Sequence, residues 1–208
     1  MSIPTRSTGA PRGTAGAEAP SQAARRLLEA AAEAFADRGF HATTTRDIAA
    51  KAGLSPAGVY VHFASKEDLL YALSRQGHES ARDLLVAAAS PGTSPTQSLA
   101  AIMSTFSRWH AEHFRVARIV QYEFQHLTPQ HREAVLGLRK EIDGVVRAVV
   151  EAGVASGEFV VQDIPATTLA LMSMAVDVAR WYSPHIRRTP ESIGADYAEL
   201  GLRLVTGR

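Results

Sequence analysis

Two histidines and one serine have spacings that first suggest metal or catalytic chemistry. His110 and His113 lie three residues apart, so on a helix their imidazoles would share a face and could bind a metal ion. The sequence places no third ligand beside them, and Ser156, in the run Gly-Val-Ala-Ser-Gly from Gly153, is misplaced for the nucleophile elbow of a hydrolase. The absence of cysteine excludes thiolate nucleophiles and zinc–thiolate sites. We therefore expect no enzyme activity, no metal and no cofactor.

Polar and cationic side chains between Thr44 and Lys66 suggest a different chemistry, the binding of DNA. Arg46 and Lys66 are cations of the kind that bind phosphates or a guanine edge. Lys66 also stands at the expected start of a helix, where backbone N–H groups attract phosphate. The net charge is only +1, divided into +2 on residues 1–64 and −1 on residues 65–208. A DNA contact must therefore depend on local geometry, because the field of the whole protein is weak.

A helix-turn-helix at residues 44–63 would position these side chains. Thr44 and Asp47 have the spacing of a capping box, and Gly53 can take the left-handed conformation of a tight turn. Ser55 would cap the second helix, with Pro56 in its first turn. An ordinary helical hairpin with a glycine turn has the same local pattern. The helix that follows directly, with a second capping box, favours the DNA-binding motif.

The longer pattern around this motif resembles the DNA-binding domain of the TetR family. Gly-Phe-x-x-Thr-Thr-x-Arg-Asp-Ile-Ala begins at Gly39, and Val-Tyr-x-His-Phe-x-x-Lys-Glu-x-Leu ends at Leu69. The match covers about residues 21–81 and agrees in spacing and residue type together. It departs at Ala57-Gly58, where the family more often has Gly followed by a small residue, and this difference concerns which bases are read.

The resemblance implies a homodimeric repressor that leaves a palindromic operator when a small ligand binds. It also implies a set of DNA-contacting residues: Thr44, Thr45, Arg46, Ser55, Pro56, Ala57, Gly58, Tyr60, Val61, His62 and Lys66. Within this set the phosphate contacts would be Thr44, Tyr60, His62 and Lys66, and the groove-facing residues Arg46, Pro56, Ala57, Gly58 and Val61. By chemistry alone, Tyr60 and His62 could instead be partly buried, ring-stacking residues. An activator or an architectural DNA binder would have the same DNA-binding domain.

Helical periodicity without a convincing strand predicts an all-α fold of about nine helices. Helices are expected at about Ser65–Ala89, Asp163–Tyr182, from Pro129 until Gly157 and from Pro190 onward, with a shorter helix near Phe114–Gln125. We expect a disordered arm at 1–20, the DNA-binding domain at 21–81, and an effector-binding and dimerisation domain at 82–208. No apolar run approaches the length of a membrane span, so the expected location is the cytoplasm.

The last two expected helices are candidates for a dimer interface. The helix at about 163–182 is apolar on two faces and needs cover on both, which a second copy of the chain would supply. The expected interface residues are Leu169, Met172, Val176, Ile193, Tyr197, Leu200 and Leu204. The alternative is that both helices pack wholly within one subunit.

Aromatic and polar residues on neighbouring helices suggest a ligand pocket in the second domain. The candidates are Trp109, His110, His113, Phe114, Arg118, Tyr122, Phe124, Met172, Met174, Asp177, Arg180 and Trp181. At helical spacing such residues can also be ordinary core. The ligand would tilt the 65–89 helix and thereby change the separation of the two DNA-reading helices.

The stretch Asp177–Pro184 is similar to a TetR subgroup that senses acyl-CoA thioesters in lipid or steroid catabolism. The resemblance implies an acyl-CoA effector, with Arg180, Arg187 and Arg188 as partners for its anionic groups. Ser183 stands where such relatives often have arginine. Surface solvation is an equally good role for these three arginines.

Overall fold

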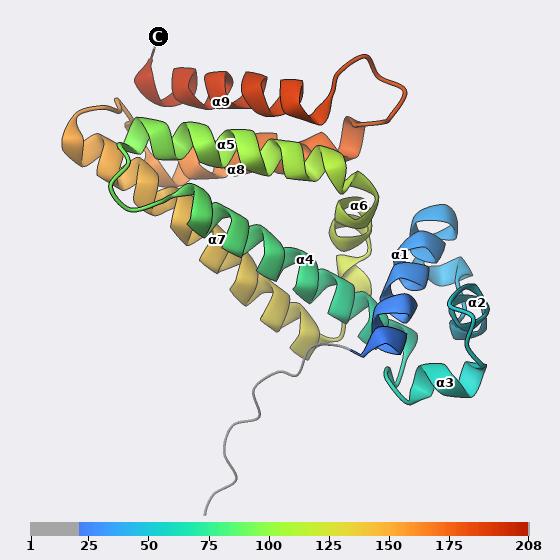
Figure 1. Cartoon of the computed structure of the whole chain (residues 1–208). Coiled ribbons are helices and arrows are strands. Elements are labelled where there is room, and N and C mark those ends of the chain that lie inside the picture. Colours follow the sequence, from blue (N-terminus) through green and yellow to red (C-terminus); the bar gives the residue numbers. More distant parts are fainter. Residues whose placement is uncertain (1–20, 208) are drawn as a thin grey trace, which may run out of the picture.

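The computed structural model describes residues 21–207, and all regular structure in them is helical (Figure 1). The predicted N-terminal arm at 1–20 lies outside this range. The helices are α1 (Gln22–Ala42), α2 (Thr45–Lys51), α3 (Pro56–Tyr60), α4 (Lys66–Ala88), α5 (Pro95–Glu112), α6 (Phe114–Tyr122), α7 (Pro129–Ser156), α8 (Ile164–Trp181) and α9 (Pro190–Thr206), with a short 3-10 helix, η1 (Phe124–His126), after α6. The predicted all-α class with about nine helices is confirmed.

Local capping and turn chemistry explains how the short helices α2 and α3 form. Thr44 Oγ1 accepts the Asp47 N–H at 3.2 Å, and Asp47 Oδ2 accepts the Thr44 N–H at 2.9 Å, which completes the predicted capping box. Gly53 has φ +66, a conformation that a side chain would strain, and it turns the chain into α3. Ser55 Oγ caps α3 by accepting the Gly58 N–H at 3.1 Å.

The second predicted capping box, at Ser65 and Asp68, is formed only in part. Ser65 Oγ accepts the Asp68 N–H at 3.1 Å, as expected for the cap of α4. The Asp68 carboxylate instead accepts the Ser65 hydroxyl at 2.9 Å, so it does not return to the backbone. Ser65 still caps the start of α4, because its hydroxyl oxygen satisfies the Asp68 N–H, which has no partner within the helix.

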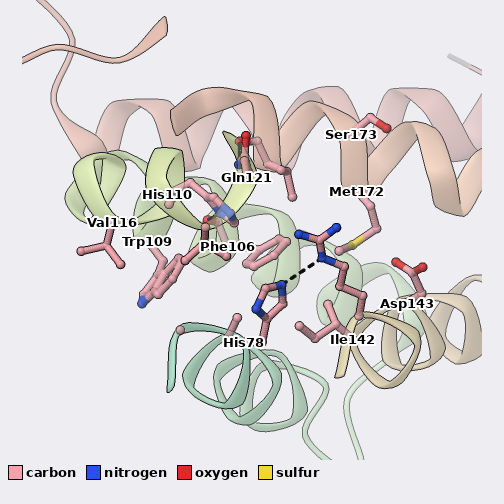
Figure 2. A pocket seen from close by; sticks show the side chains of 16 residues that line it. His78, Phe106, Trp109, His110, Val116, Gln121, Ile142, Asp143, Met172 and Ser173 are labelled. Atoms are coloured by element: carbon pink, nitrogen blue, oxygen red, sulfur yellow. Dashed lines mark hydrogen bonds between the residues drawn. The ribbon is translucent and has the colours of Figure 1, made fainter. Parts of the chain in front are cut away.

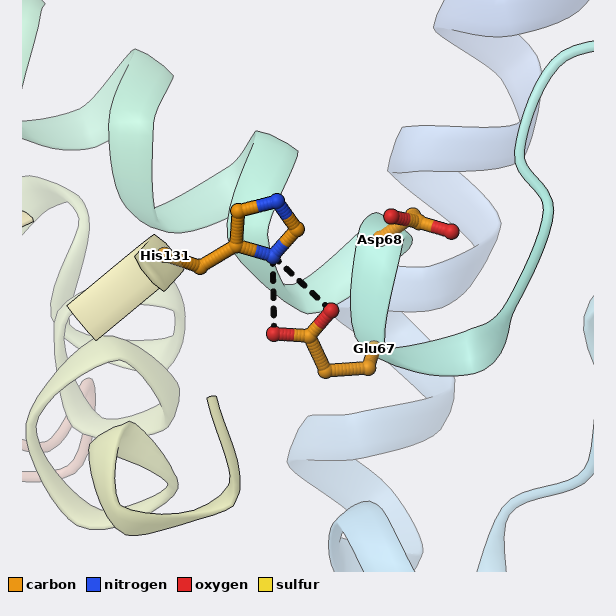
Figure 3. A group of neighbouring side chains, drawn as sticks. All are labelled: Glu67, Asp68 and His131. Carbon is orange, nitrogen blue, oxygen red and sulfur yellow. Dashed lines mark hydrogen bonds and ion pairs between the residues drawn. The ribbon is translucent and has the colours of Figure 1, made fainter. Parts of the chain in front are cut away.

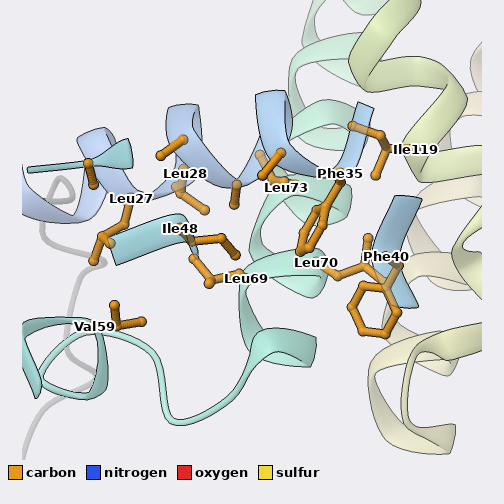
Figure 4. Close-up of a cluster of buried hydrophobic side chains, with 14 of the residues drawn as sticks. Leu27, Leu28, Phe35, Phe40, Ile48, Val59, Leu69, Leu70, Leu73 and Ile119 are labelled. Atoms are coloured by element: carbon orange, nitrogen blue, oxygen red, sulfur yellow. The ribbon is translucent and has the colours of Figure 1, made fainter. Parts of the chain in front are cut away.

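Helices α1 to α3 form a small head whose core is completed by the start of α4 (Figure 4). The labelled side chains in this core are Leu27, Leu28 and Phe35 of α1, Phe40, Ile48 of α2, Val59 of α3, Leu69, Leu70 and Leu73 of α4, and Ile119 of α6. Leu127 and Val135 belong to the same cluster. The core of the head is therefore continuous with the neighbouring ends of α6 and α7.

The remaining helices form the body, in which α4 packs along α7 while α5 packs against α8 and α9 (Figure 1). Helix α4 contributes Leu73 to the head core and Ala81 and Leu85 to the body core. The predicted division between residues 81 and 82 thus falls inside an unbroken helix, and the domain limits remain a prediction. Within residues 21–207, no helix combines the length and apolar character needed to cross a membrane.

Helices α5 and α9 cross closely because α9 presents a glycine at their contact. A Cβ placed on Gly194 would lie 2.7 Å from the backbone oxygen of Ser104. Nearby, Ile193 is fully buried against Ala111 and Val178. This packing positions α5 and α8, which line the cavity described below.

Candidate nucleic-acid interface and ligand cavity

The exposed surface of α2 and α3 carries the predicted DNA-contacting residues, with the exception of Lys66. The Tyr60 hydroxyl lies 3.3 Å from Thr45 Oγ1, so the end of α3 meets the start of α2. Val61 is 78% exposed and Tyr60 57%, so neither side chain is covered by the protein itself. The other exposed or half-exposed members are Thr44, Arg46, Ser55, Pro56, Ala57, Gly58 and His62. This surface is available to a partner.

Arg46 is the cation on this surface that remains available for DNA. It is exposed, and within residues 21–207 its guanidinium makes neither a hydrogen bond nor an ion pair. The neighbouring Lys51, in contrast, pairs with Glu33 at 2.7 Å. Ala57 and Gly58 on α3 are small, so the backbone of α3 can approach the floor of a groove closely. Contact of these residues with DNA remains a prediction.

Lys66 differs from its predicted role as a phosphate contact. Its Nζ donates to the backbone oxygens of Phe40 at 2.6 Å and Thr43 at 2.9 Å, and it lies 4.2 Å from the centroid of the Phe40 ring. Partial burial lowers the pKa of Lys66 from its ordinary value. The Phe40 oxygen otherwise accepts only a long 3.4 Å bond from the Thr43 N–H, so the carbonyls at the end of α1 attract the ammonium group. The structure therefore gives Lys66 the role of joining α1 to α4.

A cavity of about 350 Å³ lies in the body between five helices (Figure 2). This volume is at the lower end of the roughly 300–1,000 Å³ typical of small-molecule sites. Its lining comprises Gly77, His78 and Ala81 of α4, Phe106, Trp109 and His110 of α5, Val116, Ala117, Val120 and Gln121 of α6, Arg139, Ile142 and Asp143 of α7, and Met172, Ser173 and Val176 of α8. The walls are mostly apolar, with a few polar groups that could orient a ligand.

A hydrogen-bond chain from α7 to α4 fixes the main polar group of the cavity. Arg139 Nε donates to His78 Nε2 at 3.1 Å (Figure 2), and His78 Nδ1 lies 2.7 Å from the Ser74 oxygen. Because a guanidinium can only donate, His78 Nε2 must be the acceptor and the proton must be on Nδ1. The imidazole is therefore neutral. Burial, and secondarily the charge of Arg139, lower the pKa of His78.

His110 is a second neutral imidazole on the cavity wall. Its Nδ1 lies 2.9 Å from the Phe106 oxygen one turn earlier on α5, the partner to which it donates when neutral. Burial lowers its pKa from 6.5 to about 4. His110 thus presents an uncharged edge to the cavity at neutral pH. Its predicted neighbour His113 is exposed, stacks on Trp109 and bonds to its own helix, so the two imidazoles form no metal site.

Three of the predicted pocket residues line this cavity, and the others lie elsewhere. Trp109, His110 and Met172 line the cavity. The residues that lie away from its lining are His113, Phe114, Arg118, Tyr122, Phe124, Met174, Asp177, Arg180 and Trp181. Phe114, Arg118 and Tyr122 instead border a hollow of about 560 Å³ between α1 and α6. Helical spacing indicates which residues share a face, but it does not indicate how that face is rotated in the bundle.

The arginines expected to bind an anionic ligand are largely engaged by the protein itself. Arg180 makes a two-pronged contact with Asp177, with distances of 2.6 and 2.8 Å. Arg188 pairs with Asp196. Arg118 donates to three carbonyls at the end of α8, those of Ala179, Arg180 and Tyr182, at 2.7, 3.0 and 2.7 Å. Arg180 and Arg188 are therefore paired with carboxylates, whereas Arg187, the third predicted partner of an anion, is exposed and makes no hydrogen bond or ion pair within residues 21–207.

The predicted dimer residues separate into buried and exposed groups. Ile193 is fully buried within the subunit, and Met172 and Val176 face the cavity. Tyr197 packs half-buried against the same cluster as Ile193. These four side chains pack within one subunit, as expected from the alternative in which both helices pack inside a single copy of the chain. Leu169 of α8 and Leu200 and Leu204 of α9 remain exposed, by 68%, 46% and 45%.

One cluster of potential metal ligands was not expected from the sequence (Figure 3). Glu67 and Asp68 of α4 and His131 of α7 offer ligand atoms within 4.8 Å of one another. Both oxygens of Glu67 lie 2.9 Å from His131 Nδ1, while Asp68 is occupied with the cap of α4. The cluster therefore serves as a contact between the two helices. His131 lies 64 residues after Glu67, so no local pattern could have revealed the cluster.

Comparison with known proteins identifies both halves of the chain. The family described as "Bacterial regulatory proteins, tetR family" matches residues 27–73, and "Tetracyclin repressor-like, C-terminal domain" matches residues 92–205. The HTH-type transcriptional repressor KstR2 of Rhodococcus jostii is 32% identical over 179 residues, 85% of this chain and 87% of that protein. These families and relatives are transcriptional regulators and not enzymes.

Solved structures agree over nearly the whole chain. A TetR-family regulatory protein from Rhodococcus RHA1 is 40% identical, with a TM-score of 0.86, and the match covers 90% of this chain and 98% of that one. The ketosteroid transcriptional regulator KstR2 of Mycobacterium tuberculosis is 27% identical, with a TM-score of 0.80 and coverage of 91% and 97%. The relatives thus share both the head and the body.

Proposed function

Because the chain belongs to the TetR family of bacterial regulatory proteins, we propose that it is a homodimeric transcriptional repressor released from a palindromic operator by a small molecule. Regulators of this family bind operator DNA and small-molecule effectors. One observation carries the proposal for this chain, namely the continuity of α4. Leu69 and Leu70 of α4 belong to the head core, and Gly77, His78 and Ala81 of the same helix line the cavity.

The continuity of α4 supplies a mechanism for release. A ligand that presses on His78 and Ala81 displaces the middle of α4, and a rigid helix transmits this displacement to the head. Two half-sites one helical turn apart require a separation of about 34–36 Å between the recognition helices. A changed separation lowers operator affinity, and couplings of this kind are typically about 1–3 kcal/mol.

We propose that the exposed surface of α2 and α3 binds the operator. Arg46 would bind a guanine edge or a phosphate, and Thr44, Thr45, Tyr60 and His62 would contact the backbone. Ser55, Pro56, Ala57, Gly58 and Val61 would lie against the bases. The exposure of the adjacent Tyr60 and Val61 on the same surface as Arg46 leaves both side chains available to the operator.

We propose that dimerisation uses the exposed leucines of α8 and α9. Leu169, Leu200 and Leu204 present apolar surface that two-fold pairing of α8 and α9 would bury as a four-helix contact. A Leu200→Glu, Leu204→Glu double variant should be monomeric by light scattering at concentrations where the wild type is a dimer. The same mass for both proteins would exclude this interface. The proposed location is the cytoplasm.

The effector that we propose is an apolar acyl compound. The cavity has apolar walls, and matched relatives include KstR2 ketosteroid regulators and, at 23% identity, a fatty acid metabolism regulator of Bacillus subtilis. The resemblance at Asp177–Pro184 implies the coenzyme A thioester form of such a compound. Arg180 and Arg188 are bound to carboxylates of the protein, and this weakens the case for a coenzyme A thioester as the effector. Free acids are therefore included in the same test.

The experiment is a gel-shift titration on the DNA flanking the protein's own gene, with and without acyl-CoA thioesters and free acids. Specific retardation that an acyl compound reverses supports the repressor. Retardation that the compound strengthens would indicate an activator, and retardation without sequence preference would indicate an architectural DNA binder. Arg46→Gln should weaken specific binding by about 1–3 kcal/mol, whereas Arg147→Gln, on the exposed body, should not.

A further inference from the structure

Arg139 is a cation on the cavity wall that no carboxylate of residues 21–207 contacts within ion-pair distance. Its Nε donates to the neutral His78, and its guanidinium carbon lies 4.3 Å from the centroid of the Phe124 ring. Neither partner carries a negative charge. Partial burial lowers the pKa of Arg139, and the negative charge of Asp143 opposes this effect without contacting the guanidinium.

The groups around Arg139 leave its guanidinium without a carboxylate in contact. His78 and His110 are neutral, and Asp143, one turn further along α7, is outside contact distance of the guanidinium. Burial raises the pKa of Asp143 and the charge of Arg139 acts in the opposite direction, so the two groups sense each other without forming an ion pair. The forked donors of a guanidinium match the two oxygens of a carboxylate, and such charge-assisted bonds are strong away from water.

We propose that the cavity binds an apolar monocarboxylic acid, whose carboxylate pairs with the guanidinium of Arg139 and whose hydrocarbon body contacts the apolar walls. The inference rests on the proposed function only in taking the cavity as the effector site. It specifies the chemical class of the effector, a free acid and not its thioester. The His78 contact holds the Arg139 side chain in place, and the carboxylate of the ligand supplies the direct ion pair that Asp143 does not make.

The lining of the cavity favours a ligand with one acidic group and an otherwise apolar body. Phe106, Val120, Ile142 and Met172 supply hydrocarbon contacts, and these contacts would be lost by a ligand with a second charge among them. Trp109 also lines the cavity and provides an optical signal. Trp181, the other tryptophan of the chain, lies outside the lining, so Trp181→Phe isolates the signal of Trp109.

The test is direct binding of straight-chain acids from hexanoate to dodecanoate, with the matching alcohols and coenzyme A thioesters, to the full chain without DNA. Calorimetry and Trp109 fluorescence in the Trp181→Phe protein should both report binding of at least one acid, tighter than its alcohol and its thioester. Arg139→Gln should weaken acid binding by about 30-fold or more and leave alcohol binding little changed. Arg139→Lys should give an intermediate loss, since it keeps the charge without the fork.

The controls separate the anchor from general effects on the fold. Arg147→Gln removes an exposed, paired arginine from the same helix and should bind acid as the wild type does. Asp143→Asn removes a carboxylate from the cavity lining and should bind acid more tightly, because a like charge is removed. The proposal is overturned if every acid fails to bind, if thioesters bind more tightly than acids, or if Arg139→Gln binds acid normally. Operator binding without any acid is measured in parallel, so failure of the repressor is distinguished from failure of the acid site.

Discussion

The carboxylate of Glu67 on α4 holds the imidazole of His131 on α7, with both of its oxygens 2.9 Å from Nδ1 (Figure 3). Glu67 Oε1 also accepts the backbone N–H of Thr128 at 2.8 Å, at the cap of α7. The His131 ring stacks on Tyr71 with the ring centroids 3.8 Å apart. The beginnings of α4 and α7 are therefore fixed to each other, and a tilt of α4 would pivot at this end.

Removal of this contact should destabilise the junction of head and body. In Glu67→Ala the Thr128 N–H and the His131 ring both lose their acceptor, and we expect the free energy of unfolding to fall by about 1–3 kcal/mol. Glu67→Gln keeps an acceptor and should lose less. Glu79→Ala on the same helix removes only an exposed pair with Arg75 and should change stability by less than about 0.5 kcal/mol. Denaturant unfolding of the three variants measures this order, and equal losses would refute it.

Lys66 should contribute to stability and not to the salt dependence of DNA binding. Lys66→Met leaves the carbonyls of Phe40 and Thr43 without their donor, so the free energy of unfolding should fall by about 1–3 kcal/mol. Because the ammonium faces inward, the slope of log affinity against log salt should stay at its wild-type value. A phosphate contact would instead reduce that slope by about 1. A reduced slope with unchanged stability would restore the role predicted from the sequence.

The elements that local chemistry determines were predictable from the sequence. The caps at Thr44, Ser55 and Thr128 and the turn at Gly53 depend on residues a few positions apart, and the structure contains all of them. Buried faces were also predictable where one stripe of a helix is apolar, as for Leu27, Leu28, Ala31 and Phe35 of α1. The all-α class follows from these two kinds of local information.

The cavity could be predicted only in part, because it depends on how each helix is rotated in the bundle. Helix α6 turns Val116, Val120 and Gln121 inward, while Tyr122 is exposed. His78 and Arg139 are 61 residues apart, and only the packing of α4 along α7 brings them together. Arg139 lies beside the apolar stripe of α7, and a cation at that position is also typical of a solvated face. The contacts of Lys66 with Phe40 and Thr43 were not predictable for a similar reason, since its motif position does not reveal the direction of its side chain.

The close crossing of α5 and α9 should make Gly194 intolerant of any side chain. In Gly194→Ala the new Cβ would lie 2.7 Å from a backbone oxygen, so the helices must separate, and we expect a loss of about 1–3 kcal/mol. Gly144 on α7 is exposed and has open space where a Cβ would stand. Gly144→Ala should therefore stabilise the protein by about 0.5–1 kcal/mol. Thermal unfolding of both variants tests whether the glycine-to-alanine substitution lowers stability at Gly194 and raises it at Gly144.

The buried His110 should make the protein less stable as the pH falls below neutral. The folded protein binds the proton of His110 with a pKa of about 4, whereas the unfolded chain binds it near 6.5. Between these values the unfolded state binds more protons, so the free energy of unfolding decreases as the pH falls. The contribution is fully present above pH 6.5 and is lost progressively towards pH 4, to a total of about 3 kcal/mol.

Comparison with His110→Gln isolates this contribution from other groups that titrate in acid. The glutamine amide can still donate to the Phe106 oxygen, but it cannot take up a proton in this range. The difference in unfolding free energy between the wild type and the variant should therefore change in favour of the variant from pH 7 to pH 4. A difference that stays constant over this range would mean that His110 is protonated as easily in the folded protein as in the unfolded chain. Water would then reach the cavity wall at that position.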